Sequence, residues 1–145
     1  MRVIIQRVKR ASVIINKTVY SNIDCGLLCY VGFCDTDSEI DFQWVVHKLK
    51  TIKFFKGEKS LDDVKGKLLI VSQFTLFARI KKGTKPSWSK AANPELAKSF
   101  YNHFIDICKI KFSDVVDTGV FGEEMEIDSI NDGPYTLFLD TKNKE

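Results

Sequence analysis

The sequence has few of the residues that form metal sites. Its 145 residues include two histidines and four cysteines. No pair of cysteines has the C-x-x-C spacing of zinc ribbons and redox motifs, so a metal site would require His47 and His103 to converge with distant cysteines. We therefore expect free thiols in a reducing cytosol, and neither a metal nor another cofactor.

The sequence also lacks long hydrophobic runs and a large net charge. The chain has no 18-residue apolar run for a membrane span, and the apolar part of MRVIIQRVKR is too short for a signal peptide. The formal net charge is only +3, while 44% of the residues are hydrophobic and 28% are charged, as in average globular proteins. These features predict a cytoplasmic protein without a membrane partner, folded as one domain over residues 1–145.

Positive charge is concentrated in one run, RIKKGTK at residues 79–85. A basic loop of this kind raises the affinity for phosphates without selecting a nucleotide sequence. The same run is typical of a solvated hairpin tip, and composition leaves both interpretations open.

Runs of apolar and β-branched residues predict the strands. Val and Ile alternate with other residues in 2–5 and again in 12–15, which predicts two strands. The apolar run at 25–33 predicts a strand that is covered on both faces. Residues 68–78, LLIVSQFTLFA, predict another strand. Three short extended pieces follow near the C-terminus, in VVDTGVFG, EEMEIDSI and YTLFLDT.

Two segments show the three-to-four spacing of amphipathic helices. The first, DTDSEIDFQWVVHKLKTIKFF, begins with capping Asp and Ser residues, and its apolar stripe consists of Ile40, Trp44, Val45, Leu49 and Ile52. The second begins at Asn93-Pro94, with Pro at the first helical position, and its stripe consists of Leu96, Phe100, Phe104, Ile105 and Cys108. Together the elements predict a mixed α/β domain in which strands outnumber helices and form more than one sheet layer.

Three polar residues interrupt the otherwise apolar run at 68–78. In an ideal strand, Ser72 shares one face with Phe74, whereas Gln73 and Thr75 share the other. Burying a hydroxyl or amide without a partner costs about 1–3 kcal/mol, so these side chains need partners. Spacing alone allows hydrogen bonds to neighbouring loops as well as a pocket.

A second unusual stretch is NDGPYT at 131–136. Gly-Pro is a turn signal, and a plain turn between strands is one interpretation. Hairpin turns more often use Asp-Gly without a following Pro, whereas here Pro134 removes a ladder donor directly after Gly133.

SQFTL at 72–76 and NDGPYT closely resemble the two signature motifs of the D-aminoacyl-tRNA deacylases, in their usual order. The likeness extends over essentially the whole chain and includes VIIQRVKRASV, KGTKPSWSKAANPELAKSFYNHF and TGVFGEEM. The resemblance implies a layered α/β/β fold, a homodimer, and hydrolysis of the ester that joins a D-amino acid, or glycine, to the terminal adenosine of tRNA. It implies translational proofreading and tRNA as the nucleic-acid partner, with no DNA.

The resemblance also implies roles for the motif residues. Gly133 and Pro134 would form a cis peptide that reaches into the pocket of the other protomer and excludes L side chains. Ser72, Gln73, Phe74 and Thr75 would form the catalytic pocket, with backbone N–H groups near Phe74 and Thr75 stabilising the oxyanion. Thr75 is either a nucleophile or a positioning residue. A threonine nucleophile needs an activating base, and none lies near Thr75 in the sequence. We favour attack by water assisted by the ribose 2′-hydroxyl, as the resemblance implies.

Further binding residues follow from the same resemblance. Phe121, Gly122 and Met125 would line the adenosine pocket, although core packing is the simpler interpretation of the Phe and the Met without it. Arg7 would lie near the Gly-Pro segment, and Lys81, Lys82 and Lys85 would contact tRNA phosphates. The chain departs from the family pattern at Tyr135, where the family usually has a small β-branched residue.

Two other functions remain as alternatives. One is a nucleic-acid or nucleotide binding module without hydrolytic activity, which would have no reason to keep both motifs. The other is an editing enzyme for misacylated L-amino acids, which would require the Gly-Pro peptide to be trans or displaced.

Overall fold

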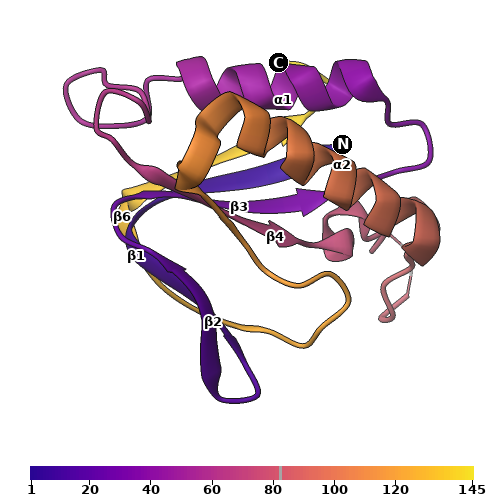
Figure 1. Cartoon of the computed structure of the whole chain (residues 1–145). Coiled ribbons are helices and arrows are strands. Elements are labelled where there is room, and N and C mark those ends of the chain that lie inside the picture. Colours follow the sequence, from indigo (N-terminus) through magenta and orange to yellow (C-terminus); the bar gives the residue numbers. More distant parts are fainter. Residues whose placement is uncertain (82) are drawn as a thin grey trace.

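The computed structural model describes residues 1–81 and 83–145. It contains six strands, two α-helices and two short 3-10 helices in these ranges (Figure 1). In chain order they are β1 (Arg2–Ile15), β2 (Thr18–Ile23), β3 (Gly26–Gly32), α1 (Glu39–Thr51), β4 (Lys67–Ser72), η1 (Phe74–Phe77), α2 (Pro94–Phe112), η2 (Ser113–Val115), β5 (Val116–Thr118) and β6 (Glu126–Asp140).

The six strands form one mixed sheet with the order β2-β1-β3-β4-β5, and β6 pairs with the other edge of β1. β1 is long enough to pair with two strands along the same edge. Its first half pairs with β3 and its second half with β2, both antiparallel. β3, β4 and β5 are parallel to one another. Because the end of β1 turns away with the β2 hairpin, the sheet curls into a nearly closed, barrel-like shape (Figure 1).

The sheet is apolar on both faces. The helices α1 and α2 cover one face (Figure 1), and the larger core cluster fills this interface. A second cluster lies inside the curled part of the sheet and consists of Val8, Ala11, Val13, Ile23, Leu28, Leu69 and Val71. The structure therefore confirms a mixed α/β domain with layered α/β/β packing and two main helices.

The start of α2 is as predicted, because Pro94 is its first residue and the Asn93 side chain accepts a hydrogen bond from the backbone N–H of Leu96 at 3.0 Å. The predicted strand at 25–33 is also confirmed, and β3 is buried on both faces. In the described residues, neither helix is long and apolar enough to cross a membrane.

Three predictions of element bounds were wrong. The runs at 2–5 and 12–15 belong to the single strand β1, and the last two extended pieces form the single strand β6. The strand expected at 68–78 ends at Ser72. In the first helix, Ile40 is 75% exposed, because the buried face is shifted to include Phe42 and Val46.

Candidate active site

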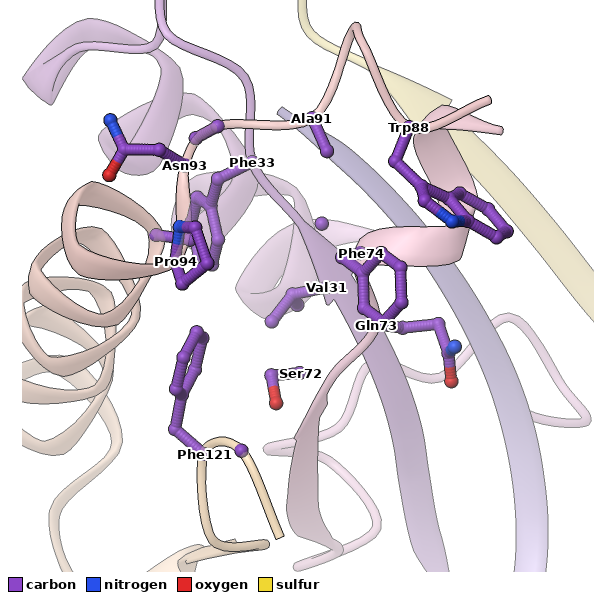
Figure 2. Close-up of a pocket in the computed structure, with 14 residues that line it drawn as sticks. Val31, Phe33, Ser72, Gln73, Phe74, Trp88, Ala91, Asn93, Pro94 and Phe121 are labelled. Carbon is purple, nitrogen blue, oxygen red and sulfur yellow. The ribbon is translucent and has the colours of Figure 1, made fainter. Parts of the chain in front are cut away.

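A cavity of about 460 Å³ lies where the parallel strands β3 and β4 end. Its lining comes from five parts of the fold: the ends of these strands, the start of η1, the loop that leads into α2, the first turn of α2, and the loop between β5 and β6 (Figure 2). The carboxyl ends of parallel strands are a common place for ligand sites in α/β proteins. The lining residues are Val31, Gly32, Phe33, Ser72, Gln73, Phe74, Trp88, Ala91, Ala92, Asn93, Pro94, Ala97, Phe121 and Gly122.

The first motif supplies the floor of this cavity. β4 ends at Ser72, and the N–H of Gln73 donates to the carbonyl oxygen of Val31 at 2.7 Å. A side chain at position 32 would not fit here, because a Cβ on Gly32 would lie 2.7 Å from the carbonyl oxygen of Gln73. The chain then turns into η1, so the polar interruption of the apolar run marks the change from strand to 3-10 helix.

Aromatic rings stand on two sides of the cavity (Figure 2). Phe74 and Trp88 meet edge to face with their ring centroids 5.0 Å apart, and both rings are substantially exposed, by 54% and 41%. Across the cavity, Phe121 lies 5.7 Å from the ring of Tyr101, whose hydroxyl donates to the carbonyl oxygen of Ile70 at 2.9 Å. Burial raises the pKa of Tyr101, so its phenol stays neutral and holds α2 against β4.

The described lining residues include no Asp, Glu, His, Lys, Arg, Cys or Tyr. The polar groups of the lining are the side chains of Ser72, Gln73 and Asn93, the indole of Trp88 and the backbone. A general base needs a titratable group within hydrogen-bond reach of the reacting atoms. The described lining therefore favours catalysis by positioning and backbone donors over acid–base catalysis by a side chain.

Thr75 is not among the residues that line the cavity. Its side chain is half-buried, and its hydroxyl oxygen accepts a hydrogen bond from the amide nitrogen of Gln73. This contact ties Thr75 to a residue of the cavity floor. The structure therefore brings Ser72, Gln73 and Phe74 together at the cavity and places Thr75 directly behind them.

The Gly-Pro motif lies elsewhere in the chain's fold. Gln6 pairs with Thr136 and Val8 with Asn131, so four residues of β6 lie opposite one residue of β1. Gly133 and Pro134 are exposed at this bulge. Neither of them lines the cavity.

Sheet register gives the separation between the bulge and the cavity. Arg7, at the bulge, pairs with Leu27, whereas Ser72 pairs with Val31 on the same strand. At about 3.3 Å per residue, the bulge lies about 13 Å from the cavity floor along the strands.

Arg7 lies against this bulge, as the resemblance implied. Its Nε donates to the carbonyl oxygen of Asp132 at 3.0 Å and forms an ion pair with the Asp132 carboxylate at 3.2 Å. Its Nη1 donates to the carbonyl oxygen of Phe54 at 2.8 Å. Arg7 is only 7% exposed and does not line the cavity.

One expectation from the resemblance was wrong in this chain. The described residues contain no cis peptide bond, so the Gly133–Pro134 peptide is trans. In one chain it is part of β6, and Gly133 with φ 138° accommodates the change of direction. Met125 does not line the cavity. It packs against the cluster inside the curled sheet, whereas Phe121 and Gly122 do line the cavity.

The sequence did not identify the part of the lining that comes from the loop before α2. Trp88 in this loop, and Asn93 and Pro94 at the start of the helix, line the cavity. The available signal was a tryptophan within a polar loop, directly before a helix start. The basic run at 79–85 precedes this part of the lining, and Lys82 lies outside the described residues.

The histidines and cysteines do not form a centre. In the described residues, no group of three or more His, Cys, Asp and Glu side chains could hold a metal ion. All four cysteines are free, as predicted. Burial raises the pKa of Cys29, and that of Cys108 to about 12, so both thiols stay protonated.

The chain is similar to known proteins over nearly its whole length. The model of the family described as D-Tyr-tRNA(Tyr) deacylase matches residues 4–140. The chain belongs to this family. A D-aminoacyl-tRNA deacylase from Cytophaga hutchinsonii is 43% identical, with both chains covered completely. One from Fusobacterium nucleatum is also 43% identical, over 99% of this chain and 97% of the relative.

Two solved structures share the fold. A protein described as c-Myc DNA unwinding element binding protein matches with a TM-score of 0.91 and 33% identity, over 97% of this chain and 98% of that one. A probable eukaryotic D-amino acid tRNA deacylase matches with a TM-score of 0.82 and 18% identity, over 95% and 97%. The deacylase family establishes the chain as a hydrolase that acts on the ester bond of D-aminoacyl-tRNA, a proofreading activity in translation.

Proposed function

We propose that the cavity above Ser72, Gln73 and Phe74 is where the ester of D-aminoacyl-tRNA is hydrolysed. The observation that carries this proposal is the combination of the SQFT motif with a described lining that has no titratable side chain. Water attacks the ester carbonyl, and the ribose 2′-hydroxyl of the substrate assists. Free tRNA and the D-amino acid are released.

The oxyanion is stabilised by backbone groups at the start of η1. The N–H groups of Phe74 and Thr75 belong to its first turn, where no carbonyl of the same helix precedes them as an acceptor. A positioned donor of this kind contributes about 3–4 kcal/mol to stabilising the transition state in acyl transfer. Thr75 positions Gln73 through their hydrogen bond and does not attack the substrate.

The terminal adenosine lies at the opposite wall. Phe121 offers a ring on which a base stacks, a contact worth about 1–3 kcal/mol in single-stranded nucleic-acid sites. Gly122 is directly beside it, and a Cβ at this position would meet no atom within 4 Å. Lys81 and Lys85 are exposed in the loop that follows η1 and contact backbone phosphates of the tRNA. The use of a 2′-hydroxyl makes tRNA, and not DNA, the substrate.

The chiral filter is the Gly-Pro segment of a second protomer. One chain holds Gly133 and Pro134 exposed and away from its own cavity, so a homodimer is needed to bring them there. β6 supports this arrangement because it pairs only with β1 among the described strands. On the same strand, Phe138 is 56% exposed.

The filter acts by exclusion. Backbone atoms of the Gly-Pro segment occupy the space that an L side chain would need, whereas a D side chain points away. The trans Gly133–Pro134 peptide is also what an editing enzyme for L-amino acids would require, but the match to D-aminoacyl-tRNA deacylases favours D esters. Glycine has no side chain to exclude, so glycyl-tRNA is also hydrolysed. Backbone recognition makes the identity of the D side chain a weak determinant, and we expect broad specificity in the cytoplasm.

A cavity-filling substitution tests the site. Ala91 is half-buried at the wall, so Ala91→Trp places a large ring in the cavity without entering the core. We expect a loss of more than about tenfold in kcat/KM for D-tyrosyl-tRNA, because a misplaced ester loses its alignment. Ser89→Trp adds the same ring to an exposed position of the same loop, outside the lining, and should retain activity. Equal activity of the two variants would contradict the proposed site.

Crosslinking tests the role of the second protomer. Ala91→Cys and Pro134→Cys are combined in a chain in which the exposed Cys25 is replaced by Ser. A short bis-maleimide should yield a covalent dimer from the double variant and far less from either single variant. A chain that remains monomeric in sedimentation and gives no covalent dimer would refute the cross-subunit filter while leaving the hydrolysis itself untouched.

A further inference from the structure

Tyr135 directly follows Pro134, and its ring packs against two residues of the scaffold. The Cζ of Arg7 lies 4.8 Å from the centre of the Tyr135 ring. The same ring meets Phe54 edge to face, with centroids 4.8 Å apart and an angle of 74° between the planes. Phe54 is 1% exposed, so one neighbour of the ring is fixed in the core. Tyr135 itself is 40% exposed.

The guanidinium under this ring determines where the Gly-Pro segment lies. It bonds to the carbonyl oxygen of Asp132, directly before Gly133, and to that of Phe54. A Cβ on Gly133 would lie 2.8 Å from Nη2 of Arg7, so this side chain lies close beneath the glycine. Rotation of the guanidinium would break its hydrogen bond to the backbone directly before Gly133.

The bulge depends on these side-chain contacts for its shape. Residues 132–135 lie between the pairs Val8–Asn131 and Gln6–Thr136, and on β1 only Arg7 lies opposite them. The amide nitrogen of Asn131 bonds to the carbonyl oxygens of Arg7, at 2.9 Å, and Tyr135, at 3.3 Å. The partly exposed Tyr135 ring lies between these contacts and solvent.

We propose that Tyr135 is a positioning residue for chiral discrimination, acting through Arg7 on the backbone of the Gly-Pro segment. This inference rests on the proposed function, in which that backbone is the filter. A cation–π contact at a partly exposed site and an edge-to-face aromatic pair both restrict the guanidinium. Without the ring, the guanidinium and the backbone at Gly133 sample more positions, and the space for an L side chain opens.

The test compares Tyr135→Phe, Tyr135→Leu and Tyr135→Ala by kcat/KM for D-tyrosyl-tRNA and L-tyrosyl-tRNA. Tyr135→Phe keeps both ring contacts and should keep the wild-type D/L ratio. Tyr135→Leu keeps apolar volume without a ring, and both it and Tyr135→Ala should lower the ratio by about tenfold. The lower ratio should come mainly from a faster reaction with the L substrate. Ile130→Ala, at a position of similar exposure on the same strand, is the matched control and should leave the ratio unchanged.

A second readout separates positioning from general stability. The ring current of Tyr135 shifts the Hε signal of Arg7 in a ¹H–¹⁵N spectrum, and this shift should be lost in Tyr135→Leu but kept in Tyr135→Phe. An unchanged D/L ratio in a folded Tyr135→Leu variant would overturn the inference. Wild-type protein that hydrolyses both substrates equally would refute the proposed filter itself, and the inference with it.

Discussion

The role of Thr75 allows the sharpest separation of two mechanisms. Its hydroxyl makes one described hydrogen bond, which it accepts from the amide of Gln73, and the residue lies outside the lining of the cavity. If Thr75 only positions Gln73, Thr75→Val removes one hydrogen bond within a side chain of nearly the same shape. One such bond contributes about 0.5–1.5 kcal/mol, which corresponds to a loss of about 2- to 10-fold in kcat/KM.

A nucleophile would behave very differently. Removing the nucleophile of a serine protease lowers kcat by about 10⁶-fold, so the two mechanisms differ by several orders of magnitude. The assay follows release of tyrosine from D-tyrosyl-tRNA under single-turnover conditions for the wild type, Thr75→Val and Thr75→Ser. We expect both variants to remain within about tenfold of the wild type.

Two results would refute this reasoning. The first is a loss of more than about 10³-fold in Thr75→Val that Thr75→Ser restores. The second is a covalent aminoacyl-enzyme trapped by rapid acid quench. Replacing the terminal ribose 2′-hydroxyl of the substrate by hydrogen should, in contrast, slow hydrolysis severely in every variant.

Three further predictions concern groups outside the cavity. Replacing both His47 and His103 by Ala should change kcat/KM by less than about twofold, whereas loss of a general base would cost at least about 10²-fold. Burial raises the pKa of Asp41, but hydrogen bonds led by that from Lys142 outweigh it and hold this pKa below the usual 3.8. The resulting stability is present above about pH 4 and is lost as the pH falls further. In urea denaturation, Asp41→Asn should therefore lower the free energy of unfolding by about 1–3 kcal/mol at pH 7 and by less at pH 3; an equal effect at both values would contradict the assignment. Gly133→Ala should cost about 1–3 kcal/mol in thermal unfolding, because φ is 138° and the new Cβ would meet Arg7, and an unchanged midpoint would be inconsistent with this backbone.

The helices and the buried strand β3 could be predicted because each carries a local, repeated pattern. The end of β4 could not. The alternation of residues Phe74 to Phe77 also fits a strand, but the structure has a 3-10 helix there, directly after the hydrogen bond from Gln73 to Val31 on another strand. That contact is tertiary and leaves no mark in the local sequence.

At the Gly-Pro segment, pairing between strands overrides a strong local signal. Asp132, Gly133 and Pro134 are strong local turn signals, yet β6 continues through them because β1 is a template for pairing on both sides. The bulge absorbs the extra residues in place of a hairpin. Local turn chemistry was therefore identified correctly, and its topological consequence was not.

The candidate site was partly predictable because one of its segments is a signature motif and another belongs to the stretch TGVFGEEM that carries the resemblance. Ser72, Gln73 and Phe74 were predicted from one motif, and Phe121 and Gly122 from the resemblance, and all five line the cavity. The wall formed by the loop before α2 depends on how that loop folds against β3, where the N–H of Ala92 donates to the carbonyl oxygen of Phe33 at 2.9 Å. Periodicity contains no information about such a contact.

The stereochemistry of hydrolysis tests the proposed filter and the site together. Purified protein is incubated with D-tyrosyl-tRNA and L-tyrosyl-tRNA prepared from the same tRNA, and release of tyrosine is measured from each. We expect rapid hydrolysis of the D ester and a rate on the L ester close to that of spontaneous hydrolysis. Equal rates on both esters, or no catalysed hydrolysis of the D ester, would contradict this expectation.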